Sequence, residues 1–239
     1  MEGLKESLAY AVELSEPHYM DHGGELYSDK PLHRVSYNPL AETKTMHTLS
    51  GLVEYIKSDV DALMDFNWIV HIVDPTLVKL YSALDTDRER EYLVDVTAKL
   101  PDFSFNRFLE HESFCIAMQS KFLQNEDRDL VLKFAGTVEE NSVQQYSDDG
   151  VSQQASVKKG IAGREVALVP NPVSLIPYRT FLEVDQPESN FIFRMRSDCG
   201  IECAIFEADG GAWQIEAMQN IKKYLTEALA DLPQFTVIA

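Results

Sequence analysis

Prolines divide the stretch from residue 165 to residue 207 into short apolar runs, and this pattern limits the possible folds more than any other feature. Pro170 and Pro177 lie between two such runs. Because proline fixes φ and has no amide donor, each run must end where the prolines begin. The pattern predicts strands over 165–169 and 178–184 on a rigid, extended platform.

A strand pair closed by a tight turn follows the platform. Residues 190–196 and 201–207 are rich in aromatic and branched side chains, and a short segment ending in Gly200 separates them. Glycine suits a turn position that needs φ > 0. We expect a β-hairpin here, before a last helix whose apolar side chains form one continuous face over 212–229.

The remaining periodicity predicts an α+β fold in which mainly antiparallel sheets are covered by a few helices. Thr48 is expected to cap a helix, and Asp74-Pro75 ends a nearly all-apolar run typical of a buried strand. The first three predicted strands form an antiparallel meander. The predicted strands are 67–73, 77–83, 91–100, 165–169, 178–184, 190–196 and 201–207, and the predicted helices are 49–60, 111–121 and 212–229.

The first 45 residues have the least regular pattern. Leu4 and Leu8 are spaced as on one face of a short helix, but prolines and glycines interrupt everything that follows. We expect a poorly structured segment over 1–45 that docks onto something else. A single α+β domain over 46–239 should follow, with a soft boundary near 101–136.

A polar ribbon is predicted before the platform. Residues 142–146 and 151–157 are rich in Ser, Gln and Val and flank Asp148-Asp-Gly150, a strong hairpin signal. An isolated two-stranded hairpin is only marginally stable in water. We expect this protruding hairpin to supply contacts of a homo-oligomer. The alternative is a solvated arm that becomes ordered on meeting a partner.

The chain is strongly acidic, because 39 Asp and Glu residues against 21 Lys and Arg residues give a formal net charge of −18. Such a field repels phosphates and anionic lipids, so direct binding to nucleic acid or to a membrane is disfavoured. The three cysteines form no Cys-x-x-Cys motif, and neither a signal peptide nor a long apolar run is visible. We therefore expect a cytoplasmic protein.

Six segments share a pattern with a known family, namely Thr48–Ile56, Glu112–Ser120, Asp148–Gln154, Val169–Val173, Pro177–Val184 and Phe206–Trp213. Together they resemble the conserved phage and prophage family of unknown function that includes the YfdQ-type proteins, over residues 48 to about 229. The resemblance rests on overall pattern and not on a catalytic signature. It implies a phage or prophage origin, and so a bacterial host cytoplasm, and it carries over no site residues.

Two sets of side chains have metal-ligand chemistry but lack a complete ligand set. His18 and His22 are four residues apart, yet a proline and a glycine beside them disfavour the helix that would present both to one metal. Cys199 and Cys203 lie on either side of a turn, and the third cysteine, Cys115, belongs to an apolar helical stripe. We expect no metal and no cofactor.

No stretch of the sequence demands one catalytic chemistry, since it contains neither a nucleophile elbow nor a phosphate-binding loop. We therefore assign no catalytic residues. The enzyme alternative is a protein acting on nucleotides or nucleic acid, with His71 or His111 as acid or base beside Asp74 or Glu112.

Four arginines are the exception to the acidic balance of the C-terminal half: Arg164, Arg179, Arg194 and Arg196. If they converge, they can hold an anion such as a nucleotide phosphate. The alternative, which we favour, is that they pair across strands with acidic residues. These acidic residues are Glu183, Asp185, Glu202 and Glu207.

The expected function follows from the charge, the resemblance and the missing catalytic motifs. We expect a phage or prophage accessory protein that binds a host protein or a small anionic ligand without turning it over. Counter-defence against the host is one such role.

Overall fold

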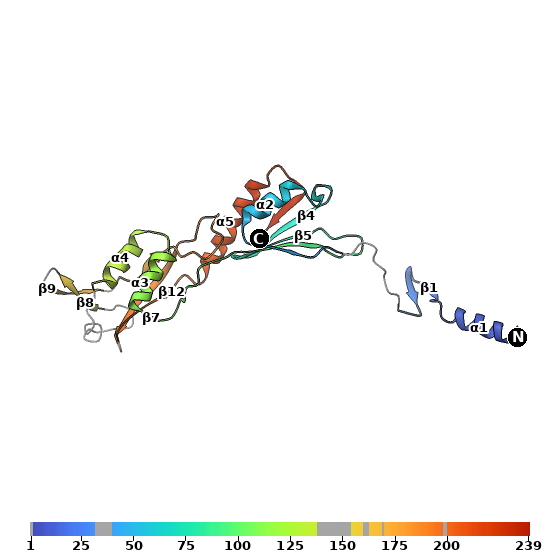
Figure 1. Cartoon of the computed structure of the whole chain (residues 1–239), viewed down its shortest axis with the longest axis horizontal. Helices are drawn as coiled ribbons and strands as arrows, with labels where there is room; N and C mark the ends of the chain where they lie inside the picture. The colour runs from blue at the N-terminus through green and yellow to red at the C-terminus, as the bar shows by residue number, and fades with distance from the viewer. Residues whose placement is uncertain (1, 32–39, 138–153, 160–162, 169, 198–199) are drawn as a thin grey trace. The chain divides into compact units, whose positions relative to one another are not determined.

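The computed structural model describes residues 2–31, 40–137, 154–159, 163–168, 170–197 and 200–239. The chain divides into two compact units, Met1–Leu40 and Ala41–Ala239, which we call the N-terminal unit and the main unit (Figure 1). The main unit contains two larger sheets, each beside its own hydrophobic core.

The N-terminal unit holds one helix and one strand pair. Helix α1 (Glu2–Glu13) precedes the antiparallel strands β1 (Tyr19–His22) and β2 (Glu25–Ser28). The spacing of Leu4 and Leu8 suggested a short helix here, and both side chains are exposed on it. The described residues of this unit contain no buried side chain, so its elements pack against no core of their own.

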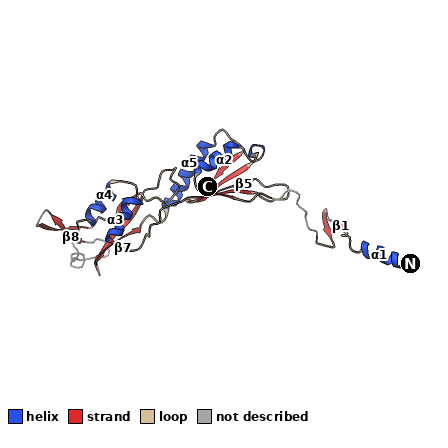
Figure 2. Ribbon diagram, viewed as in Figure 1, coloured by secondary structure: helices blue, strands red, loops and turns tan. Residues whose placement is uncertain are grey.

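The first sheet of the main unit has the strand order β13-β4-β5-β6-β3. Strands β4, β5 and β6 form an antiparallel meander, while β13 runs parallel to β4 and β3 runs parallel to β6. Helices α2 and α5 lie over this sheet (Figure 2), and a short 3₁₀ helix, η1, precedes β4. The bounds are β3 Lys44–Met46, α2 Leu49–Ser58, η1 Leu63–Asp65, β4 Trp68–Asp74, β5 Leu77–Ser82, β6 Tyr92–Thr97, α5 Ala212–Ala228 and β13 Phe235–Ile238.

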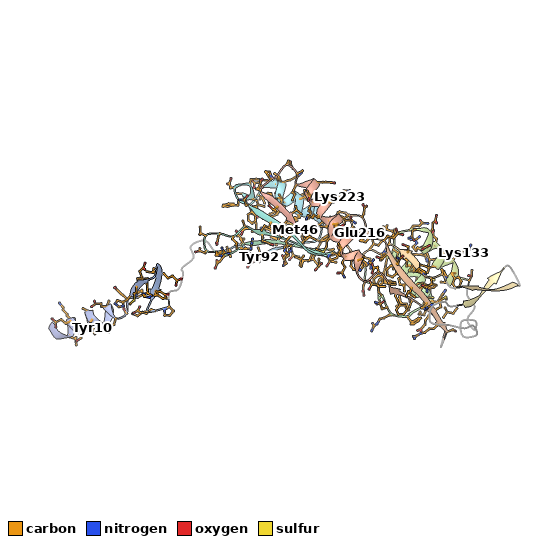
Figure 3. The ribbon with its side chains drawn as sticks, turned by 180° about the vertical axis from the view of Figure 1, so that it is seen from behind. Tyr10, Met46, Tyr92, Lys133, Glu216 and Lys223 are labelled. Atoms are coloured by element: carbon orange, nitrogen blue, oxygen red, sulfur yellow. The ribbon has the colours of Figure 1, made fainter. Side chains whose placement is uncertain are left out.

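The first core lies between this sheet and the two helices. Alternate residues of β4, such as Val70 and Ile72, are buried because a strand sends successive side chains to opposite faces. Ile56 of α2 and Ile221 of α5 join the same cluster. The charged residues of α5 lie on the solvent side of the helix, as Glu216 and Lys223 do in Figure 3.

The second sheet has the strand order β10-β11-β12-β7 and is antiparallel throughout. Helices α3 and α4 pack beside it, and its core is rich in phenylalanine. Stacked rings of Phe114 and Phe193 join α3 to the sheet. The bounds are β7 Leu109–Glu110, α3 His111–Ser120, α4 Glu126–Ala135, β10 Val173–Leu175, β11 Ser189–Ser197 and β12 Ile201–Glu207.

The predicted α+β fold class, with mainly antiparallel sheets and a few helices, is confirmed. Thr48 caps α2 as predicted, since its side chain accepts a hydrogen bond from the Gly51 amide at 3.2 Å. The predicted hairpin is the β11–β12 pair, and Gly200 in its turn has a φ of 122°. Helices α2, α3 and α5 fall within two residues of their predicted bounds.

The predicted strand over 178–184 is wrong. This segment is irregular, and the side chain of Gln186 satisfies its backbone in place of a neighbouring strand. Its Oε1 accepts hydrogen bonds from the amides of Arg179 (3.0 Å) and Thr180 (3.2 Å), and its Nε2 donates to the carbonyl of Phe181 (2.9 Å). An amide side chain has both the donors and the acceptor needed for this. Phe181 and Val184 of this segment pack in the first core without forming a strand ladder.

The ribbon predicted over 142–157 lies mostly outside the described residues. Its last residues belong to β8 (Gln154–Lys159), which pairs antiparallel with β9 (Gly163–Leu168). These two strands form a separate two-stranded sheet. None of the helices in the described part of the chain is long and apolar enough to cross a membrane.

Candidate functional site

The segment from Ile176 to Gln186 connects the two cores of the main unit, and the candidate site lies along it. At its start, the amide of Leu123 donates to the carbonyl of Ile176 at 2.8 Å, which ties the segment to the second core. Further on, Thr180 donates from its hydroxyl to the carbonyl of Pro75 at 2.6 Å. Phe181 is buried in the first core. The residues between these anchors therefore lie where the two cores meet, a position that we call the seam.

Arg179 occupies the middle of this seam and is only 6% exposed. Its Nη1 lies 3.0 Å from Oε1 of Glu207, and its Nη2 donates to the hydroxyl of Ser189. The guanidinium carbon lies 4.1 Å from the ring centre of Trp213 and 5.6 Å from that of Phe105. A planar guanidinium stacks well on aromatic faces, so these rings stabilise the Arg179 cation by packing against it.

The buried surroundings of Arg179 affect the pKa and the hydrogen bonding of its guanidinium. Burial lowers the pKa of its guanidinium from the ordinary value, while the carboxylates of Glu207 and Asp209 oppose the shift. Arginine keeps its proton at neutral pH even so. Its Nε–H is buried and has no hydrogen-bond partner within the described residues. A buried donor without a hydrogen bond costs about 1–3 kcal/mol, so an acceptor that reached this Nε–H would be bound favourably.

Asp209 positions Trp213 beside Arg179 by capping the start of α5. Its carboxylate accepts hydrogen bonds from the amide of Gly211 at 3.0 Å and from the amide of Trp213 at 3.4 Å. Burial alone would raise the pKa of Asp209, but these amides and the charge of Arg179 outweigh it and lower the pKa overall. The N-cap residue of α5 is Gly211, which has no side chain, so the carboxylate of Asp209 supplies these hydrogen bonds instead.

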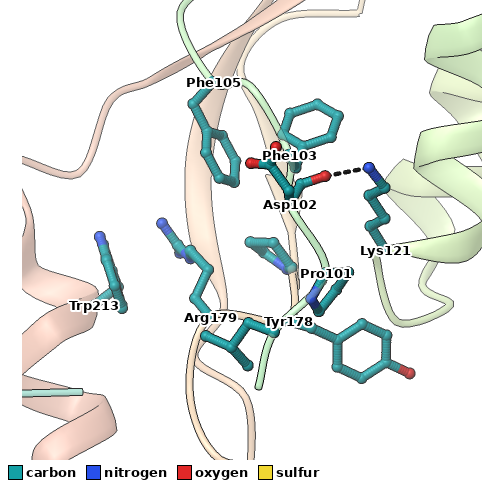
Figure 4. Close-up of a pocket in the computed structure, with 10 residues that line it drawn as sticks. Pro101, Asp102, Phe103, Phe105, Lys121, Tyr178, Arg179 and Trp213 are labelled. Atoms are coloured by element: carbon teal, nitrogen blue, oxygen red, sulfur yellow. Dashed lines mark hydrogen bonds between the residues drawn. The ribbon is translucent and has the colours of Figure 1, made fainter. Parts of the chain in front are cut away.

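A hollow of about 420 Å³ opens beside Arg179, and we call it the Arg179 hollow. Figure 4 shows Trp213 and Phe105 beside Arg179, and Lys121 across the hollow with its ammonium directed at Asp102. The ammonium of Lys121 donates to the backbone carbonyl of Asp102. The complete lining is Leu100, Pro101, Asp102, Phe103, Phe105, Lys121, Pro177, Tyr178, Arg179 and Trp213. Aromatic walls with a few polar groups are typical of small-molecule sites.

Of the four predicted arginines, Arg194 and Arg196 do not line the Arg179 hollow, and the side chain of Arg164 lies outside the described part of the structure. Arg196 lies near the turn of the β11–β12 hairpin, where it pairs with Glu202 and stacks on Phe108 at 4.2 Å from the ring centre. Arg194 lies two residues earlier on β11, and Arg164 belongs to β9. Arg179 and Arg196 thus pair with acidic residues that the alternative named, but only the Arg196–Glu202 pair joins two strands. Of those arginines whose side chains are described, Arg179 alone is in the lining of the hollow.

The histidines of the enzyme alternative have other partners. The ring of His71 lies 3.3 Å from the hydroxyl of Tyr81. Asp74 instead accepts hydrogen bonds from the amide and hydroxyl of Thr76. His111 contacts the carbonyl of Ala135 at 3.0 Å through Nε2. These contacts do not assemble an acid–base pair at either predicted position.

The candidate metal ligands are placed as follows. Nδ1 of His18 lies 3.0 Å from Asp29, and His22 pairs with Glu25 across the β1–β2 ladder. Cys203 is buried on β12, and Cys199 lies outside the described residues. Within the described part of the chain, no three His, Cys, Asp or Glu side chains gather in a group that could hold a metal.

Sequence reasoning missed most of the hollow. Lys121 closes α3, and Phe103 and Phe105 lie in a loop, so no periodicity marks them as neighbours of Arg179. The best sequence signals were Pro101 with two nearby phenylalanines, and Trp213 two residues after the glycine pair Gly210-Gly211. Both point to aromatic side chains held at the edge of an element.

The fold and the site define an α+β protein in which a cationic, aromatic hollow lies at the seam of two cores. No protein-family model, no curated protein and no solved structure matches this chain. Its function must therefore be argued from the hollow itself.

Proposed function

We propose that this protein binds a small anionic ligand in the Arg179 hollow and does not turn it over. We further propose that it is a phage- or prophage-encoded accessory protein that works in the cytoplasm of a bacterial host. The resemblance to the YfdQ-type family and the net charge of −18 support the second proposal, since so acidic a protein is soluble and avoids nucleic acid.

One observation carries the binding proposal: two cationic side chains, Arg179 and Lys121, line an aromatic hollow on a strongly acidic protein. Lys121 has an ammonium with three donors, and its one observed partner is a neutral carbonyl. A small turn of Arg179 would also let its unmet Nε–H reach an acceptor. Each of these two groups can donate a charge-assisted hydrogen bond to a ligand carboxylate.

The local charge balance limits how much negative charge the ligand can carry. Glu207 already pairs with Arg179, and the side chain of Asp102 lines the same hollow. A ligand with one negative charge gains from Lys121 without strong repulsion from Asp102, whereas a highly charged ligand meets both carboxylates. We therefore expect a monoanion.

The test is a titration with sodium butyrate, followed by the fluorescence of Trp213. Full-length protein should give a saturable change, and Lys121→Gln should weaken binding about tenfold, because a hydrogen bond to a charged group contributes about 1.5–3 kcal/mol. Lys133→Gln is the matched control, since Lys133 is an exposed lysine on α4 that does not line the hollow. Trp213→Phe should remove the signal and leave only the background from Trp68.

Two results would overturn the proposal. One is the absence of any saturable response in the wild-type protein at butyrate concentrations up to the highest it tolerates. The other is an equal loss of affinity in Lys121→Gln and Lys133→Gln, which would mean that the anion is attracted only by general surface charge.

We also propose that the protein forms a homo-oligomer through its polar ribbon. The support is that β8 and β9 form a sheet of only two strands, and such a sheet is marginally stable unless something covers it. Light scattering on the full chain should give an oligomeric mass, and deleting residues 142–157 should give a monomer. A monomeric full chain would refute the proposal.

A further inference from the structure

A second hollow of about 540 Å³ adjoins the Arg179 hollow, and we call it the Leu182 hollow. The two share Pro101 and Tyr178 in their linings, so the hollows are neighbours that both border these two residues. The second hollow carries no lysine or arginine in its lining. One end of the combined site is thus cationic and the other is not.

The walls of the Leu182 hollow are mainly apolar. Leu123, Leu182 and Val184 line it, and Leu182 is 64% exposed, which is costly for a leucine side chain. Of its polar residues, Gln186 already uses its amide group on the backbone of the seam segment. This leaves few polar groups to orient a ligand there, so apolar contact is what the hollow offers.

From this pairing we infer that the ligand is a linear monocarboxylate with an aliphatic chain. The carboxylate would bind Lys121 and Arg179, and the chain would pass Tyr178 and cover Leu182. This inference rests on the proposed function, because it names the ligand class of the same site. A carboxylate suits it better than a phosphate dianion, since Asp102 and Asp185 each line one of the two hollows.

The experiment is a chain-length series with the full-length protein, from butyrate through hexanoate to octanoate, followed by Trp213 fluorescence. Burial of one methylene contributes about 0.8 kcal/mol, so affinity should rise up to about fourfold per methylene. Octanol tests the chain without the charge and should bind much more weakly than octanoate. Octyl phosphate tests the dianion and should also bind more weakly.

Two variants distinguish binding of the aliphatic ligand chain in the Leu182 hollow from nonspecific hydrophobic binding to the protein surface. Leu182→Asn should remove most of the dependence of affinity on chain length. Ile215→Asn is the matched control, because Ile215 on α5 is 65% exposed and lines neither hollow. Both positions are exposed, so neither substitution should impair folding.

The outcomes distinguish the two proposals. If no carboxylate binds at all, the proposed function fails and this inference fails with it. If butyrate binds but octanoate binds equally well, or if Ile215→Asn flattens the series as much as Leu182→Asn, the function stands and the inferred ligand class is wrong. A steep series that only Leu182→Asn flattens is the result we expect.

Discussion

An arginine–glutamate ion pair lies at each end of the β11–β12 ladder, and the two pairs have different surroundings. At one end Arg179 pairs with Glu207, which lies opposite Phe191, and at the other Arg196 pairs with Glu202 across the strands. Each arginine also stacks on an aromatic ring. The difference is burial, because the Arg179 side chain is 6% exposed and that of Arg196 is 47% exposed.

This comparison shows how burial changes the role of an ion pair. An exposed pair is screened by water and contributes little, whereas a buried cation must be paired and held by its surroundings. At the Arg179 end the protein supplies Glu207, Ser189 and several rings. A ligand charge close to such a buried cation would be felt more strongly than one beside an exposed pair.

The largest expected effect is on stability when each arginine is removed. Arg179→Ala should lower the free energy of unfolding by about 3 kcal/mol, because it leaves Glu207 facing an empty, partly buried space. Arg196→Ala should lower it by about 1 kcal/mol or less, the scale of an exposed pair with one ring contact. Urea denaturation measures both. Equal losses would show that burial does not distinguish the two ends.

The next effect concerns the segment that carries Arg179. Gln186→Leu removes the acceptor of the Arg179 and Thr180 amides, and we expect a loss of about 2 kcal/mol in unfolding free energy. Gln119→Leu is the control, because Gln119 is exposed on α3 and donates only to the carbonyl of Cys115. Thermal and urea denaturation should rank the two variants clearly. A neutral Gln186→Leu would mean that water replaces the glutamine at no cost.

A smaller effect, of about 1 kcal/mol at pH 7, should follow from Asp209→Asn, because the charged cap stabilises the start of α5. The pKa of Asp209 in the folded protein lies below its ordinary 3.8. Its contribution is therefore complete above about pH 4 and is lost as the pH falls through the lowered value. Unfolding measured from pH 7 to pH 3 should show the gap between variant and wild type closing. A gap that is constant with pH would refute this.

The smallest effect is chemical and concerns the middle of the ladder. Burial raises the pKa of the Cys203 thiol to about 12 and also raises that of Cys115. In a Cys199→Ser variant, a thiol reagent at pH 8 should therefore react slowly with the native protein and with two thiols after denaturation. Rapid reaction of the native variant would show that the core between the two ends opens readily.

The sequence predicted the helices and strands better than it predicted which of them pair or pack with one another. The meander, the β11–β12 hairpin and three helices were predictable because periodicity and turn residues are local signals. The parallel strands β3 and β13 were missed, since their pairing partners are distant in the sequence. The segment at 178–184 was taken for a strand because its apolar run looks like one, although Gln186 supplies its hydrogen bonds.

The site shows the same limit. Arg179 was named as an anion-binding candidate, and it pairs with Glu207, one of the acidic residues that the alternative named, although Arg179 lies in an irregular segment and not on a strand. No local pattern, however, could place Lys121 across the hollow from it, because that neighbourhood depends on how two cores meet.

The most direct test of the binding proposal is an NMR titration of the arginine Nε–H signals with sodium butyrate. Arg179→Lys and Arg196→Lys would assign the two resonances at the opposite ends of the ladder. We predict that the Arg179 signal shifts saturably as its unmet Nε–H gains an acceptor, while the Arg196 signal stays in place. An unmoved Arg179 signal, or a shift confined to Arg196, would contradict the account.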